Sequence, residues 1–399
     1  MWNWVARRMG VKLIRTLISF GRYEAAKKLL QQLIAKDNRD YNAWLLLGWC
    51  NAQQQAFEKA LAAYDHALQV KPDLAYAHAE MGCVLARLSR YKEGAEYLQR
   101  AMRIQPGFRK KLSYAYAMGV CTARLDRLSE SLACFETACN LDPSSGSAFL
   151  EMGWVLLHLE RYEEAEITLR KAIALCPDNA FAHQCLGLAL VELERFGEAE
   201  PVLRRAVVLD PKDGISRFNF GRVLTELGRL GDAVPELEEA ARLDPIENGT
   251  YAGLWLAQSG LRNWEEALRA AEMLASRVPG NADPLAFRAI ALVELGRLDE
   301  AEAAIRQSMD ISPNSQSAHE ALAQLHLKRS EFEEVAQIAN SGKVPAGSAV
   351  ELLKMIADEH LRAHRLDLAS QQVDSLRQLD EEESRKLAER IASASAPQN

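Results

Sequence analysis

The chain has 399 residues, of which 48% are apolar and 26% are charged, so it is long enough for several domains and too polar for a membrane bundle. Its 48 basic and 55 acidic residues give a net charge of −7, which argues against a general nucleic-acid binder. The seven cysteines include no C-x-x-C pair, so we expect neither a disulfide framework nor a zinc site, and a reducing, cytoplasmic location. We therefore expect a folded, soluble protein without a membrane span.

The first expected element is a basic amphipathic helix from Trp2 to Phe20. Residues 1–40 carry nine basic and three acidic side chains, a surplus of +6. The apolar side of this helix comprises Trp2, Val5, Met9, Leu13, Leu17 and Phe20. Two interpretations stay open: the apolar side caps the first part of the fold, or the helix lies on an anionic membrane surface.

From residue 41 onward, glycine and proline recur at a fixed interval of 34 residues, with one step of 37. The glycines are Gly48, Gly82, Gly119, Gly153, Gly187 and Gly221. The prolines are Pro72, Pro106, Pro143, Pro177, Pro211, Pro245, Pro279 and Pro313. One three-residue insertion, from Arg109 to Lys111, explains the longer step in both series. The chain is therefore an array of equal units.

Each unit is expected to be a hairpin of two antiparallel helices. Position 1 of the eight clear units falls at residues 41, 75, 112, 146, 180, 214, 248 and 282. Small residues at positions 8 and 20 let two helices approach closely, and an aromatic residue or Leu at position 17 begins the second helix. The proline at position 32 ends that helix, because it has no N–H group to donate.

Within the first unit, Trp44-x-x-Leu47-Gly48, Ala60, Tyr64 and Pro72 resemble the signature of the tetratricopeptide repeat. The resemblance implies an all-α solenoid of about eleven hairpins, forming one extended domain that binds segments of other proteins on its concave side. The expected parts are residues 1–40, with the basic helix and a degenerate capping repeat; 41–315, with eight clear repeats; 316–383, with two degenerate repeats; and 384–399, with a capping helix and tail.

Positions 2, 5, 9 and 12 of the first helices are expected to line the concave side. The candidate groove residues are Leu45, Trp49, Tyr76, Cys83, Tyr116, Val120, Leu150, Trp154, Phe181, Leu188, Ile215 and Phe218. An exposed apolar and aromatic strip is typical of a surface that binds a partner peptide or helix, with Trp49 and Trp154 as the leading anchors. The alternative is that neighbouring hairpins cover these side chains.

The remaining features give no sign of catalysis. His360 and His364 have the i, i+4 spacing of metal ligands, but we interpret His360 as a packing residue. A basic zone over residues 97–125 either receives an acidic partner segment or keeps an inserted loop in solution. We expect a non-catalytic scaffold, adaptor or chaperone with protein partners, and no cofactor, metal, nucleic acid or small-molecule substrate. Alternatives are a membrane assembly or secretion factor docking through residues 1–20 and, third, an enzyme regulatory subunit.

Overall fold

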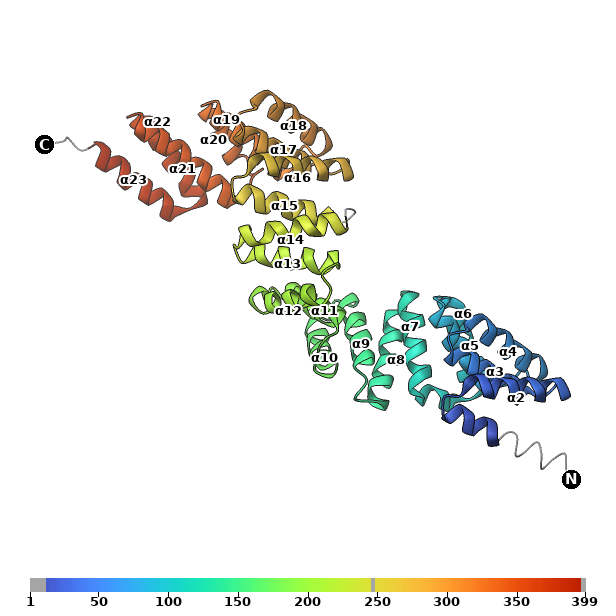
Figure 1. Cartoon of the computed structure of the whole chain (residues 1–399). Coiled ribbons are helices and arrows are strands. Elements are labelled where there is room, and N and C mark those ends of the chain that lie inside the picture. The colour runs from blue at the N-terminus through green and yellow to red at the C-terminus, as the bar shows by residue number, and fades with distance from the viewer. Residues whose placement is uncertain (1–11, 245–247, 396–399) are drawn as a thin grey trace. The chain divides into compact units, whose positions relative to one another are not determined.

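The computed structural model describes residues 12–244 and 248–395 (Figure 1). All regular secondary structure in this part of the chain is helical, which confirms the predicted all-α fold. The helices form two compact units, Met1–Leu209 and Asp210–Asn399, whereas the sequence predicts one extended stack. Among the described residues, no helix is long and apolar enough to cross a membrane.

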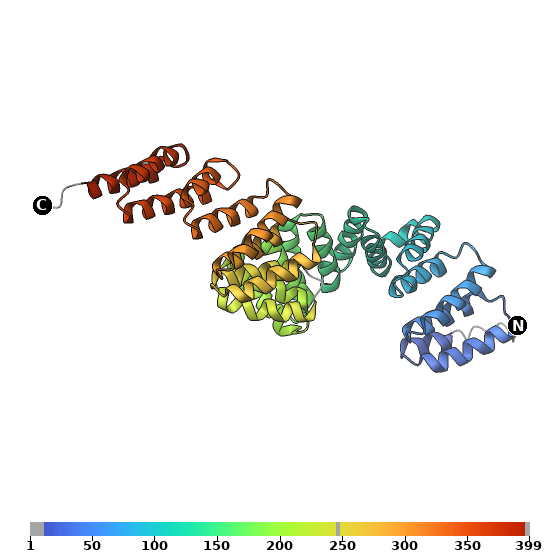
Figure 2. The ribbon, with the colours of Figure 1, turned by 90° about the horizontal axis from the view of Figure 1, so that it is seen from above.

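The helices follow one another as antiparallel pairs in both units (Figures 1 and 2). The first unit contains α2 (Tyr23–Lys36), α3 (Tyr41–Gln53), α4 (Phe57–Val70), α5 (Ala75–Arg87), α6 (Tyr91–Ile104), the short 3₁₀ helix η1 (Pro106–Lys110), α7 (Leu112–Arg124), α8 (Leu128–Leu141), α9 (Gly146–His158), α10 (Tyr162–Leu175), α11 (Ala180–Glu192) and α12 (Phe196–Leu209). The second unit contains α13 (Gly214–Glu226), α14 (Leu230–Leu243), α15 (Asn248–Gly260), α16 (Trp264–Arg277), α17 (Asp283–Glu294), α18 (Leu298–Ile311), α19 (Gln316–Lys328), α20 (Phe332–Asn340), α21 (Ala346–Arg362), α22 (Leu366–Leu379) and α23 (Glu381–Ser395). Odd-numbered helices from α3 to α21 are the first helices of their hairpins.

In the six hairpins from α3/α4 to α13/α14, the glycine at position 8 contacts a large side chain at position 24. A Cβ atom on Gly153 would lie 2.5 Å from Cγ of Leu169, and one on Gly187 would lie 2.3 Å from Cδ2 of Leu203. These distances are far below the roughly 3.5–4.0 Å at which carbon atoms attract each other. The same contact joins Gly48 to Tyr64, Gly82 to Leu98, Gly119 to Phe135, and Gly221 to Leu237. Any larger residue at position 8 would push the two helices apart.

The turn inside each hairpin has a residue with left-handed backbone at position 15. Three of these residues are glycines, and eight carry side chains: Gln55, Ser89, Asp126, Glu160, Glu194, Arg262, Ser330 and His364. The next N–H group donates to the carbonyl at position 11, as from Arg161 to Leu156 at 3.0 Å and from Arg365 to His360 at 2.8 Å. This bond and the positive φ define a Schellman cap. The cap ends the first helix, and the chain then reverses direction into the second helix.

The described part of the N-terminal helix, residues 12–19, packs on the first hairpin. Ile14 is buried and joins a core cluster with Ala26 and Leu30, and Leu17 and Ile18 pack on that cluster. Leu13 and Phe20 are exposed by 51% and 75%, so the predicted apolar side is wrong at these two residues. Positions 14, 17 and 18 follow the i, i+3, i+4 spacing of a single helix face. Trp2, Val5 and Met9 lie outside the described residues.

The histidine pair near the C-terminus has no metal geometry. His360 is buried and meets the ring of Phe332 edge to face at 5.3 Å, while His364 occupies position 15 of the turn. Burial lowers the pKa of His360, which favours its neutral form. No group of three or more His, Cys, Asp or Glu side chains within residues 12–244 and 248–395 is arranged to hold a metal ion.

Enlarging position 8 should destabilise one hairpin. We expect Gly153→Ala to lower the free energy of unfolding by about 1–3 kcal/mol through overpacking, measured by thermal and urea unfolding followed by circular dichroism. Gly197→Ala is the matched control, since a Cβ atom there meets nothing within 4 Å, and it should be neutral or slightly stabilising. Equal effects of the two changes would contradict the close-approach argument.

Substitution of the left-handed turn residue should change the free energy of unfolding in the opposite direction. We expect Glu194→Gly to raise the free energy of unfolding by about 1 kcal/mol, because a side chain at φ of 57° is strained and glycine is not. Gly228→Ala, at the equivalent position with φ of 72°, should lower it by a similar amount. Urea denaturation of both variants measures the effect. A loss of stability in Glu194→Gly would contradict the explanation by backbone strain.

Candidate functional site

The candidate groove residues lie on first helices, as the register predicts. In the first unit, α3, α5, α7, α9 and α11 each contact the next helix of this series, so ten of the twelve candidates belong to one continuous row of helices. Ile215 and Phe218 lie on α13 of the second unit and are considered apart from that row. The row is the candidate binding face of the first unit.

Exposure along this face depends on the position within the repeat. The exposed candidates, Tyr76, Phe181 and Ile215, all occupy position 2, with 43%, 42% and 52% of their surface accessible. Leu150 at position 5 is buried and offers little surface to a ligand. The others are half-buried: Leu45, Trp49, Cys83, Tyr116, Val120, Trp154, Leu188 and Phe218. Neighbouring hairpins therefore cover part of the strip, as the alternative interpretation proposes.

Trp49 takes part in packing, a role that the sequence did not predict. Its ring meets Tyr23 edge to face at 5.9 Å and packs on the cluster that contains Ile14 and Leu47. Leu45, Cys83 and Tyr116 likewise pack against buried clusters. Removing these side chains would open space in the fold as well as remove a contact surface.

Trp154 has a more polar environment. The guanidinium carbon of Arg124 on α7 lies 4.6 Å from its ring centre, and the ring of His158 lies 3.9 Å away. Nearby on α9, burial raises the pKa of Glu151, although the charge of Arg124 opposes this shift. A half-exposed indole beside a cation and a carboxylate has both an apolar surface and polar groups to offer a ligand.

The three-residue insertion builds an aromatic box around its own lysine. Phe108 of η1 is fully buried, and its ring centre lies 4.9 Å from that of Tyr76 and 5.1 Å from that of Tyr114. The Lys111 ammonium donates to the Tyr76 hydroxyl at 2.9 Å and lies 4.3 Å from the Tyr76 ring centre. Part of the basic zone thus serves packing and cation–π contacts. The sequence signal was the aromatic Phe108 inside an otherwise charged loop.

A half-buried carboxylate lies beside this box. Glu80 of α5 accepts a hydrogen bond from the Tyr114 hydroxyl at 2.9 Å. Burial raises the pKa of Glu80, and the Tyr114 hydrogen bond and the Lys111 charge only partly oppose the shift. At neutral pH the ionised form of Glu80 therefore costs stability in the folded state.

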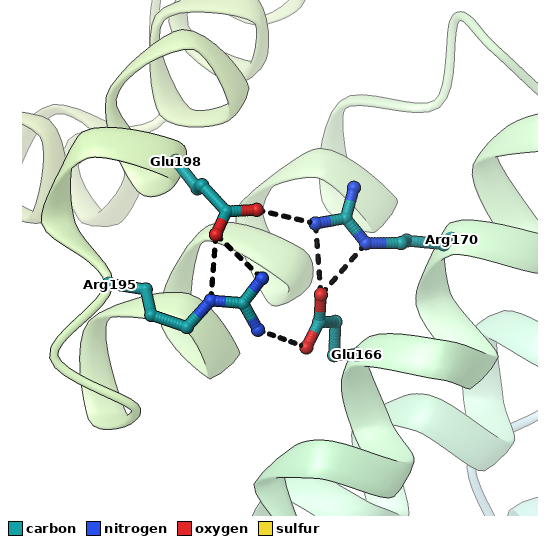
Figure 3. A network of polar contacts seen from close by, with 4 residues as sticks. All are labelled: Glu166, Arg170, Arg195 and Glu198. Atoms are coloured by element: carbon teal, nitrogen blue, oxygen red, sulfur yellow. Dashed lines mark hydrogen bonds and ion pairs between the residues drawn. The ribbon is translucent and has the colours of Figure 1, made fainter.

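The second helices carry a different kind of polar contact. Glu166 and Arg170 of α10 form a closed network with Arg195, which directly precedes α12, and with Glu198 in the first turn of α12 (Figure 3). Arg195 approaches Glu166 to 2.6 Å, and Arg170 approaches Glu198 to 3.1 Å. Burial raises the pKa of Glu166, but hydrogen bonds from Arg170 and Arg195 outweigh it and leave that pKa below its ordinary value. This network joins two successive hairpins.

Comparison with known proteins agrees with these hairpins. Two family models, both described as tetratricopeptide repeat, match residues 11–75, 123–180, 186–246 and 260–325, together more than half of the chain. The chain belongs to the tetratricopeptide repeat family. At the general level of its family, this tetratricopeptide repeat protein is a scaffold for protein–protein interaction.

Individual relatives of this tetratricopeptide repeat protein are distant. A DnaJ homolog subfamily C member 7 homolog of Dictyostelium discoideum is 26% identical over 149 residues, which cover 34% of this chain and 28% of the relative. Anaphase-promoting complex subunit 7 of the same organism is 28% identical over 129 residues, covering 32% of this chain and 22% of the relative. The chain thus spans less than a third of the length of these curated relatives.

Solved structures of tetratricopeptide repeat proteins are also similar to parts of the chain. YrrB, described as having an unusual peptide-binding site, is 26% identical and covers 46% of this chain and 94% of its own, with a TM-score of 0.40. A tetratricopeptide repeat protein from Parabacteroides merdae is 14% identical and covers 59% of this chain and 93% of its own, with a TM-score of 0.44.

The buried carboxylate of the repeat face gives a pH-dependent prediction. Since the pKa of Glu80 is raised on folding, the free energy of unfolding should fall as pH rises from the ordinary glutamate range, about 4.3, through that raised pKa. Glu80→Gln keeps an oxygen for Tyr114 and removes the charge, so we expect a higher melting temperature at pH 7 and a gain that shrinks toward pH 4.

Glu93→Gln is the control for this titration. Glu93 is exposed, and its hydrogen bond from Arg90 lowers its pKa, so its ionised form favours folding. The melting temperature of Glu93→Gln should be unchanged or slightly lower at pH 7. If Glu80→Gln melted at a lower temperature than the wild type at pH 7, the charge of Glu80 would be stabilising, and the prediction would be wrong.

Proposed function

We propose that this chain is a non-catalytic scaffold, adaptor or chaperone that binds a peptide or amphipathic helix of a partner protein on the first-helix face of its first unit. The observation that carries the proposal is the half-exposed Trp154, flanked by Arg124 at 4.6 Å and His158 at 3.9 Å. Exposed Phe181 on the adjacent helix α11 extends the aromatic surface. Aromatic residues dominate the binding energy of many interfaces because they bury a large rigid area.

The setting of this face supports a protein ligand. Its exposed candidate residues, Tyr76 and Phe181, are aromatic. Arg124 and Glu151 supply one group of each charge near Trp154. An apolar surface with a few polar groups suits an amphipathic segment, whose apolar side chains bind the aromatic rings while its polar groups pair at the rim. No disulfide joins the described cysteines, which fits a reducing compartment, and we propose the cytoplasm.

The N-terminal helix favours a capping role over membrane docking. Ile14, Leu17 and Ile18 pack on the first hairpin, so they are not available to a lipid surface. The exposed Leu13 and Phe20 lie beside Lys12 and Arg15, a small apolar area for an interfacial helix. Membrane docking therefore remains the weaker proposal.

The test separates binding from stability. We expect Trp154→Ala to weaken partner binding by about 2 kcal/mol or more with little change in melting temperature. Wild type and variant are compared by affinity capture with mass spectrometry, and then by titration with the captured partner. Ile167→Ala, which removes an apolar side chain exposed by 58% on second helix α10, is the matched control and should leave both quantities unchanged.

Two further variants calibrate the result. Trp264 packs on a buried cluster of the second unit, so Trp264→Ala should lower the melting temperature first. Trp49→Ala should lower it too, because Trp49 packs on the first hairpin. The proposal fails if Trp154→Ala melts early while the remaining folded protein binds the partner as tightly as the wild type does.

A further inference from the structure

The second unit contains a cavity of about 890 Å³ where α19 faces α21. Glu320, Gln324 and Leu327 of α19 form one wall, and α21 forms the other. The Ser348 hydroxyl of α21 donates to Glu320 Oε1 at 2.7 Å, which joins the two walls. Apart from Glu294 of α17, the lining lies in the degenerate repeats after residue 315, where no candidate groove residue was predicted.

The cavity is lined by more acidic than basic groups. Five carboxylates line it, Glu294, Glu320, Glu351, Asp358 and Glu359, against two cations, Lys328 and Arg362. Each cation is already paired with a carboxylate, Lys328 with Glu294 at 3.2 Å and Arg362 with Glu359 at 3.1 Å. Two residues outside the lining, Lys354 and Arg390, pair with Glu351 and Asp358 at 3.0 and 2.8 Å.

Glu320 differs from the other four carboxylates. Within the described part of the chain, its carboxylate has a hydroxyl partner, Ser348, and no cation within ion-pair distance. One turn later on α19, the Oε1 atom of Gln324 is buried and accepts no hydrogen bond from the described residues. Buried acceptors cost free energy unless a donor reaches them. Gln324 therefore lacks a donor, and the half-buried Glu320 beside it lacks a cationic partner among the described residues, so the pair favours a ligand that brings a cation.

An apolar surface lies beside these acceptors. Met355 of α21 lines the cavity with 53% of its surface exposed, and Leu327, Phe332 and Leu352 continue the apolar lining. Leu352 and Phe332 belong to the core of the last hairpins, so this side of the cavity is held in place. Methionine is flexible and polarisable, and it adapts to apolar side chains of different shapes.

We propose that this cavity binds a basic amphipathic segment of a partner protein. A Lys or Arg side chain of that segment donates to Glu320 and Gln324, and an apolar side chain next to it packs on Met355. The excess of carboxylates in the lining selects a cationic ligand over an acidic one. This site lies in another unit of the chain, and its lining is acidic where the first-unit face is aromatic. The proposal therefore does not rest on the function proposed above.

The test uses the full chain and a fluorescein-labelled peptide in which pairs of Lys and Leu alternate, with binding followed by fluorescence anisotropy. We expect saturable binding that weakens as salt is raised, and no binding of the same peptide with Glu in place of Lys. Glu320→Gln should weaken binding by about tenfold or more, since it removes a charge-assisted hydrogen bond. Met355→Gln, a change at an exposed side chain, should also weaken it and serves if Glu320→Gln fails to fold.

Two variants decide between a site and diffuse attraction to an acidic protein. Glu333→Gln removes the same charge from an exposed position on α20 outside the cavity lining and should leave binding unchanged. Trp154→Ala in the first unit should also leave it unchanged, which separates this site from the aromatic face. Equal affinities for wild type, Glu320→Gln, Met355→Gln and Glu333→Gln would overturn the proposal, and so would equal binding of the acidic peptide.

Discussion

The contact between position 8 and position 24 sets the geometry of the hairpins of the first unit, which carry the candidate binding face. At Gly153, the first helix lies directly against the large side chain of Leu169 on the second helix, and the equivalent glycines make the same contact. The large residue fills the space that a Cβ atom would take, so the separation of the two helices is fixed by sterics rather than by directional bonds. Because these hairpins repeat the same contact, equal positions on their successive first helices form rows, and the candidate binding face is one of these rows.

The sequence predicts the hairpins well because their determinants are local and periodic. Small residues at position 8, and an aromatic residue or Leu at position 17, recur at a spacing that helix geometry explains, and α4, α6 and α8 begin at Phe57, Tyr91 and Leu128. The turn between the helices was not predicted in such detail. Its left-handed residue is Gln, Ser, Asp, Glu, Arg, His or Gly in different hairpins, so residue type does not reveal it. A backbone hydrogen bond from position 16 to position 11 holds that conformation instead.

The candidate sites were less predictable because exposure depends on neighbours outside the repeat. Trp49 has the same position in its repeat as Trp154, but the N-terminal helix and Tyr23 cover part of it. Phe108 directly precedes an insertion whose charges suggested a solvated loop, and three-dimensional contact with Tyr76 buries it. The acidic cavity lies between α19 and α21, in degenerate repeats whose proline and glycine are lost, so the periodic pattern could not place their first-helix rows.

The carboxylates of the first unit divide according to the helix that carries them, and this division bears on function. On second helices, Glu93, Glu164 and Glu166 have lowered pKa values because arginines donate hydrogen bonds to them, so their ionised forms favour folding. On first helices, burial raises the pKa of Glu80 and Glu151, whose ionised forms oppose folding at neutral pH. Acidification should therefore weaken the ion pairs of the second helices, whereas protonation of Glu80 and Glu151 should favour folding of the first-helix face. Polar groups held at a cost to stability are typical of functional surfaces, since packing alone would favour apolar residues there. By this physical criterion, the first-helix face around Glu151 and Trp154 is the part of the first unit that best fits the proposed binding site.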